Sequence, residues 1–235
     1  MGIYSLVDKQ FGEMIVCTRK GMSSMTVRWD NGTLRICIPE GVSEKWIFNT
    51  LEPMRNRILL LNHHAISYGI GQEIVCYRHK VKIGTYDGGS RGIGYGGDGS
   101  DLYVNISKDA DITDSNIIET ISLCICRLMA RRAEGVLIPH AIEVAKSLGV
   151  MPRKFVIGRG FRKLGHCTTQ KDIQLSHNLM FLPEELIDFV ICHELAHLTH
   201  MNHSMAFHDL CNKYCNGREA TLKRALKNFH WCIIR

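Results

Sequence analysis

Five histidines and one glutamate are concentrated in the segment ICHELAHLTHMNHSMAFH, residues 191–208. The stretch from His193 to His197 matches the pattern H-E-x-x-H. On a helix, positions i and i+4 place both imidazoles on one face, one turn apart, so they can share a metal ion. Glu194 points about 100° away from His193, because each helical residue turns by that angle, and it can reach water beside the ion. The pattern therefore requires a helix here and predicts a metal site.

The third ligand of such a site depends on where the helix ends. His200 would lie about 10.5 Å along the axis from His193, at 1.5 Å per residue. Zn–N bonds are only about 2.0–2.1 Å long, so one ion does not easily take both side chains. His203 can reach the ion only if the helix stops near His200 and the chain folds back at Met201-Asn202. Asn202 tolerates the left-handed backbone that we expect such a turn to need.

Two further side chains compete with His203. His208 would need a longer excursion of the chain. Glu219 would imitate the glutamate that some zinc enzymes take from a later helix, but its surroundings also fit an ordinary helix start, where the dipole favours a glutamate. We expect one Zn²⁺ ion on His193, His197 and His203, with Glu219 as the alternative third ligand.

Length and composition favour a soluble protein with one large domain or two small ones. The chain has 235 residues, of which 45% are hydrophobic and 22% charged. It contains no run of 18 apolar residues, and its N-terminus does not resemble a signal peptide, so we expect a cytoplasmic protein without a membrane partner. Ten cysteines without a C-x-x-C pair predict reduced, mostly buried thiols.

The charge balance leaves the type of partner open. A net charge of +6 permits an acidic or nucleic-acid partner. The basic residues are dispersed, however, and no nucleic-acid motif supports such binding. The sequence does not indicate an oligomeric state.

The first half of the chain favours β-structure. Strands are expected within 13–39, around the hairpin signal Asp30-Asn31-Gly32. A helix capped by Ser43 should run to about residue 61, and residues 73–83 and 101–106 look extended. The glycine-rich stretch between these strands fits a hairpin tip better than a nucleotide loop, because a strand follows it where a dinucleotide site needs a helix. No internal repeat is evident.

The second half favours helices. Helices are expected at 114–133 and 138–148, a strand at 172–176, a helix from Pro183 through the H-E-x-x-H motif, and helices at 204–215 and 218–229. We divide the chain into 1–112, a mostly β region with the glycine-rich hairpin, and 113–235, a helical region that carries the metal site. One continuous domain is the alternative. The fold class is α+β, with an antiparallel N-terminal β region.

The segment PEELIDFVICHELAHLTHMNHSMAFH resembles the signature of the YgjP-like metallopeptidases, minimal zincins related to the SprT and WLM groups. That signature is H-E-L-A-H-L, a short spacer, N-H-S and a phenylalanine, here Phe207. The resemblance implies that His193, His197 and His203 bind zinc and that Glu194 is the catalytic acid and base. It also implies a minimal zincin-like unit with a small sheet beside the H-E-x-x-H helix.

The resemblance extends upstream. The segment LGHCTTQKDIQLS is similar to the family's W-G-S-C turn and the strand after it. Gly165 and Cys167 match the turn, whereas Leu164 and His166 stand in place of tryptophan and serine. His208 also stands where the family often has tryptophan.

In zincin-like folds a strand edges the substrate cleft. We expect the strand 172–176 to take this place and bind an extended peptide. The predicted substrate-binding residues are Ile173, Gln174, Leu175 and His166. A second donor to the oxyanion is also expected, with His166, Tyr214 and Arg162 as candidates.

The expected function is that of a zinc metallopeptidase acting on a peptide or protein. Glu194 would take a proton from water and pass it to the leaving amine. Two alternatives stay open. The first is a catalytically silent, zinc-stabilised binding module. The second is a protease that acts on nucleic-acid-bound proteins.

Overall fold

The computed structural model describes residues 2–30, 33–56, 58, 66–87, 92–99, 101–158 and 163–234. Contacts divide the chain into two compact units, Met1–Ala65 and Ile66–Arg235. The boundary predicted at residue 112 lies inside the second unit, between a strand and a helix that share one hydrophobic core. The described elements of the first unit are β1 (Ile3–Asp8), β2 (Gly12–Arg19), β3 (Thr26–Asp30), β4 (Thr33–Pro39), α1 (Glu44–Leu51) and the 3-10 helix η1 (Glu52–Met54).

The second unit carries two sheets and the longer helices. Its described elements are β5 (Glu73–Cys76), β6 (His79–Tyr86), β7 (Ile93–Asp98), β8 (Asp101–Ser107), α3 (Ser115–Ser147), β9 (Lys154–Gly158), β10 (Gly165–Cys167), β11 (Asp172–Ser176), η2 (His177–Phe181), α4 (Glu184–Ala196), α5 (Met205–Tyr214) and α6 (Glu219–Lys227). The mixture of separate small sheets and helices confirms the predicted α+β class.

The N-terminal sheet has the order β1-β2-β4-β3. The hairpins β1–β2 and β3–β4 are antiparallel. The β3–β4 hairpin was predicted, whereas β1 was not. Residues 31 and 32 of the predicted turn lie outside the described residues, but Asp30 pairs with Thr33 on either side of them. The central pair β2–β4 is parallel, which the sequence analysis did not anticipate.

The two four-stranded sheets share one topology. The sheet of the second unit has the order β5-β6-β8-β7, again with two antiparallel hairpins around a parallel central pair. In each unit two residues separate the last two strands, and a helix follows whose N-cap is Ser43 or Asp114. The chain therefore contains a structural repeat that its sequence does not reveal, because the topology needs only alternating apolar residues at equivalent positions.

Helix α1 is shorter than predicted. The Ser43 hydroxyl accepts a hydrogen bond from the Trp46 amide, which confirms the predicted cap. The α-helix ends at Leu51 and gives way to η1, which carries Pro53 near its start. Proline has no amide hydrogen to continue an α-helical ladder, so a 3-10 turn is a natural continuation. Residues 57 and 59–61 of the predicted helix lie outside the described residues.

Helix α3 is a single helix of 33 residues, whereas the sequence predicted two. Gly135 and Pro139 are residue types that often interrupt helices, but Ala133, Leu137 and Ala141 form a fully buried stripe across this region. Burial of the continuous stripe outweighs the local propensity to break. Pro139 and Gly135 are exposed, so water can satisfy the carbonyl group that loses its partner. Among the described residues, no helix combines the length and apolar content that a membrane span requires.

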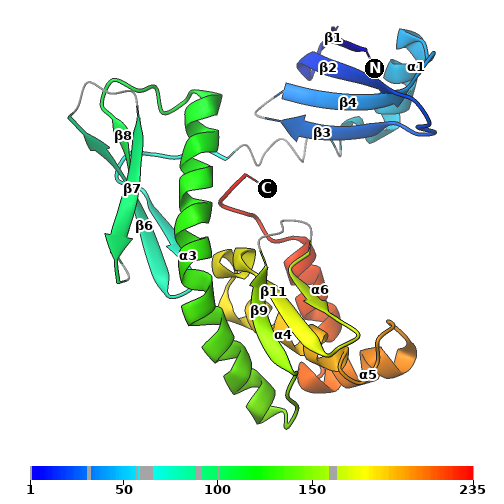
Figure 1. Ribbon diagram of the computed structural model, residues 1–235. Coiled ribbons are helices and arrows are strands. Elements are labelled where there is room, and N and C mark those ends of the chain that lie inside the picture. Colours follow the sequence, from blue (N-terminus) through cyan, green and yellow to red (C-terminus); the bar gives the residue numbers. More distant parts are fainter. Residues whose placement is uncertain are drawn as a thin grey trace. The chain divides into compact units, whose positions relative to one another are not determined.

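The third sheet has the order β10-β11-β9, with β11 in the centre. β11 runs parallel to β9 and antiparallel to β10. β10 is a short strand in a region that the sequence predicted as a turn. Figure 1 shows α3 extending from the sheet of β6, β7 and β8 to the region of β9 and α4. The ten cysteines are all free, and eight of them are buried, which confirms that most of the thiols are buried.

A partly buried ion pair joins α3 to α4. The His140 ring contacts the Asp188 carboxylate, with 2.6 Å between Nε2 and Oδ1. His140 is buried, whereas the Asp188 side chain is partly exposed. This hydrogen bond raises the pKa of His140 above its usual value, although burial opposes the effect. The pair therefore stabilises the fold most when His140 is protonated.

We predict that Asp188→Asn lowers the free energy of unfolding by about 2 kcal/mol at pH 6, and by less at pH 9. The pKa of folded His140 is raised, so its contribution is complete below the unfolded pKa and disappears as pH rises through the folded pKa. Chemical denaturation at both pH values measures the difference. Glu134→Gln, at an exposed site on α3, is the control. An equal loss at pH 6 and pH 9 would contradict the assignment.

Candidate metal centre

The helix that carries the H-E-x-x-H motif ends within the motif. α4 stops at Ala196, and His197 is its C-cap residue. The His200 amide still donates to the Ala196 carbonyl at 3.0 Å, after which the chain turns away and Ser204 caps α5. The predicted break near His200 is confirmed. The expected left-handed backbone at Asn202 is wrong: the described non-glycine residues with positive φ are Arg78, Lys171 and Asn216.

The break returns His203 to the two histidines of α4. The His203 and His193 Nε2 atoms are 3.1 Å apart. One ligand nitrogen from each of His193, His197 and His203 lies within 4.8 Å of the other two. Two nitrogens bonded tetrahedrally to one zinc ion would be about 3.3 Å apart, given Zn–N bonds of about 2.0–2.1 Å. The spacing and the imidazole chemistry of this group fit a single zinc ion.

A backbone carbonyl group and an aromatic side chain restrict the orientation of the histidine rings. His197 Nδ1 is 2.9 Å from the His200 carbonyl oxygen, to which it can donate, and this leaves Nε2 for a metal. The fully buried Phe207 stacks on the His197 ring at 4.4 Å between centroids. The same phenylalanine meets the rings of His193 and His203 edge-on at 4.9 and 4.8 Å. Phe207 therefore forms an apolar floor that restricts the orientation of all three imidazoles.

Burial keeps the ligand nitrogens of α4 neutral. It lowers the pKa of His193 to about 4, helped by the nearby His197 and His203. Burial is also the main cause that lowers the pKa of His197. A neutral imidazole has the lone pair that a metal requires, so at pH 7 these rings need not release a proton before binding.

Glu194 lies beside the histidines but outside their cluster. The residue is 6% exposed. Burial raises the pKa of Glu194 to about 7, while a hydrogen bond from the Cys167 amide acts in the opposite direction. A carboxyl group with such a pKa can both accept and donate a proton near neutral pH.

The turn between β10 and β11 stabilises the end of α4. Lys171 has a φ of 64°, and its Nζ donates to the Leu198 carbonyl. Carbonyl groups at the end of a helix lack partners within the helix, and a lysine is a favourable donor to them. This contact joins the turn to the residue that directly follows His197.

The other candidate ligands occupy different positions. His200 contributes its backbone carbonyl to the ring of His197. Glu219 binds His208 instead, with 2.7 Å between Oε1 and Nδ1. Among the described residues, the only group of three or more potential ligands at metal-binding spacing is the histidine triad, without Glu219 or His208.

The strand that was predicted to edge the substrate cleft, β11, is the central strand of its sheet. β11 has a strand neighbour on each side, so it cannot accept a peptide strand. Ile173 and Leu175, predicted to contact substrate, are fully buried and pack in the core. Gln174 and its cross-strand partner His166 are exposed. β10 and β9 are the two edge strands of this sheet, and β10 is the one that lies against Glu194. The sequence pattern concealed β10 because it is only three residues long.

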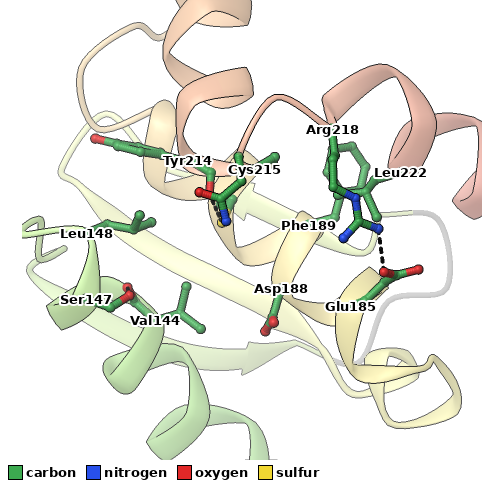
Figure 2. Close-up of a pocket in the computed structure, with 12 residues that line it drawn as sticks. Val144, Ser147, Leu148, Glu185, Asp188, Phe189, Tyr214, Cys215, Arg218 and Leu222 are labelled. Carbon is green, nitrogen blue, oxygen red and sulfur yellow. Dashed lines mark hydrogen bonds and ion pairs between the residues drawn. The ribbon is translucent and has the colours of Figure 1, made fainter.

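A pocket of about 390 Å³ lies on a different face of α4. Figure 2 shows its walls, which include Leu148 of α3 and Phe189 of α4, with the ion pair of Arg218 and Glu185 beside them. Tyr214, a candidate oxyanion donor, lines this pocket, whereas the three histidines and Glu194 do not. Arg162, another candidate donor, lies outside the described residues.

We predict that His203→Ala abolishes stoichiometric zinc binding and that His200→Ala retains it. The first change removes one of three ring nitrogens, whereas the second keeps the backbone carbonyl that orients His197. Elemental analysis after dialysis, followed by chelator competition, measures the difference. Equal zinc affinities of the two variants would remove His203 from the site.

We predict that Glu194→Gln stabilises the metal-free protein more at pH 8 than at pH 5. Because burial raises the pKa of folded Glu194 to about 7, the ionised carboxylate destabilises the fold above that pH. The gain at pH 8 is at most about 3 kcal/mol, and it shrinks as pH falls toward the unfolded pKa. Denaturation of chelator-treated protein at both pH values provides the test, with Glu134→Gln as the control. A gain that does not depend on pH would contradict the prediction.

Comparison with known proteins agrees with the family resemblance of the motif. The sequence matches a family model described as YgjP-like, metallopeptidase domain, over residues 23–229. No curated protein and no solved structure gives a match. The family model covers most of the chain, including every residue of the candidate metal centre. The chain therefore belongs to the YgjP-like family of metallopeptidase domains.

Proposed function

We propose that this protein is a zinc-dependent peptidase in which Glu194 acts as general base and general acid. The observation that carries the proposal is the grouping of three imidazole nitrogens within 4.8 Å, with a buried carboxyl group next to one of them in the chain. Membership of a metallopeptidase family supports the same reaction class.

His193, His197 and His203 would hold the ion. When bound, zinc supplies a Lewis acid that polarises the peptide carbonyl and lowers the pKa of water toward 7. Catalytic zinc sites keep a position open for water and substrate, whereas structural sites close with a fourth protein ligand. In the part of the chain that the structure describes, no fourth ligand joins the three histidines. This donor set favours a catalytic site.

Glu194 would move the proton. One carboxylate oxygen takes a proton from the attacking water and later delivers it to the amine that leaves. The pKa of about 7 suits both steps, because the group is neither too weak a base nor too weak an acid near neutral pH. The Cys167 amide holds the carboxyl group in place during this exchange.

The substrate would bind as an extended peptide along β10. In the described sheet β10 has one strand neighbour, so its other side offers backbone hydrogen bonds. His166 projects from this strand and is close enough to His197 that its charge lowers the pKa of that ring. We propose His166, with the neighbouring Gln174, as the side chains of this strand that contact substrate. His166 is also a candidate donor to the oxyanion.

We predict that Glu194→Gln keeps stoichiometric zinc and lowers peptide cleavage at least about 100-fold, because the change removes the proposed proton acceptor. Digestion of an unbiased peptide library, read by mass spectrometry, combined with elemental analysis measures both properties. Glu134→Gln is the matched control, as an exposed glutamate far from the motif in sequence.

Two results would reject the peptidase assignment. One is a zinc-loaded wild-type protein that cleaves nothing, and the other is a Glu194→Gln variant that cleaves as well as wild type. A DNA affinity with steep salt dependence and no proteolysis would instead favour a zinc-stabilised binding module, which the charge of +6 permits.

A further inference from the structure

The edge strand β10 lies against the proposed proton carrier. A Cβ atom added to Gly165 would be 2.5 Å from both Cγ and Oε1 of Glu194, and 2.7 Å from its Cδ. Carbon atoms in contact are normally about 3.5–4.0 Å apart. Any side chain at position 165 would therefore displace the Glu194 carboxyl group or the strand.

The backbone of Gly165 does not itself require glycine. Its φ angle is not among the positive values that occur at eight other glycines, such as Gly97 and Gly149. A larger residue could adopt the extended conformation of β10 without backbone strain. The space occupied by Glu194 is thus the feature of the described structure that excludes a side chain here.

The strand is fixed in its position. Gly165 pairs with Leu175 and Cys167 pairs with Ile173, and both partners are fully buried in β11. The Ser176 amide adds a hydrogen bond of 2.8 Å to the Leu164 carbonyl. Because β10 cannot easily shift, a clash at position 165 would act on Glu194.

Two residues of β10 contact the same carboxyl group. Residues i and i+2 of a strand face the same side, so Gly165 and Cys167 both face α4, while His166 faces solvent. Gly165 offers the space, and the Cys167 amide offers a hydrogen bond to the carboxylate. The Glu194 carboxyl group is therefore packed against Gly165 and accepts a hydrogen bond from the Cys167 amide.

We propose that Gly165 is a positioning residue for catalysis: its lack of a side chain lets β10 hold the Glu194 carboxyl group at the place from which it transfers protons. This inference rests on the proposed peptidase function. Its structural basis is the contact between position 165 and Glu194. That contact can be tested without an activity measurement.

The first experiment is a stability cycle on metal-free protein. Gly165→Ala should lower Tm by about 5 °C, because it overpacks a buried contact. In a Glu194→Ala background the same change should lower Tm by no more than about 1 °C, because the clashing atoms are gone. Gly94→Ala is the control, because Gly94 also lies in a strand but has open space around its Cβ position. An equal loss in both backgrounds would overturn the inference.

The second experiment separates positioning from metal binding. Zinc-loaded Gly165→Ala should retain one ion per chain and an unchanged KM, while kcat falls about 100-fold, as expected for a displacement of about 1 Å. Gly94→Ala should retain wild-type kcat. A Gly165→Ala protein with wild-type kcat would overturn the positioning role. Loss of zinc from this variant would also overturn it, because Gly165 would then act on the metal site and not on Glu194.

The two proposals fail in different ways. A wild-type protein that cleaves no peptide rejects the peptidase function and, with it, the catalytic meaning of Gly165, whatever the stability cycle shows. An active wild-type protein with an active Gly165→Ala variant rejects the inference alone. If Gly165→Ala does not fold, recovery of folding by Glu194→Ala supports the contact, and failure to recover rejects it.

Discussion

The metal centre depends on the return of the chain after α4. A longer helix would carry His203 away from His193, whereas the chain here ends the helix at Ala196 and brings the two Nε2 atoms to 3.1 Å. The His200 backbone contributes twice, since its amide makes the last helical hydrogen bond and its carbonyl contacts the His197 ring. Lys171 binds the free Leu198 carbonyl from a neighbouring turn. The end of the helix, as much as the helix itself, therefore builds the site.

The surroundings of the site act differently on its basic and acidic groups. Burial lowers the pKa of His193 to about 4 and so keeps its lone pair available, whereas burial raises the pKa of Glu194 to about 7. Both effects arise because a charged group loses hydration when it is enclosed. The ionised carboxylate destabilises the metal-free fold, and β10 must confine it. In the proposed mechanism, stability and proton transfer are therefore coupled through this one short strand.

The two four-stranded sheets of the chain are followed by helices of very different length. Both units have the same strand order and the same parallel central pair, and in both a capped helix follows. In the first unit that helix is α1, of eight residues, whereas in the second it is α3, of 33 residues. The extra length lets α3 contact β9 and α4 as well as its own sheet. All residues of the candidate metal centre belong to the second unit.

The sequence by itself determined the features that follow from local geometry. The spacing of His193 and His197, the overshoot of His200 and the need for a break all follow from the rise of a helix, which is a property of the backbone alone. The sequence also indicated the strands of the β3–β4 hairpin and the cap at Ser43. Only the tertiary structure decided which strand borders the site, because the edge position of β10 and the central position of β11 depend on how the strands pair. Packing likewise decided that α3 continues through Pro139, since the buried stripe from Ala133 to Ala141 outweighs a local signal to stop. The close approach of Gly165 to Glu194 was inaccessible for the same reason: 29 residues separate them in the chain, and only the folded sheet brings them into contact.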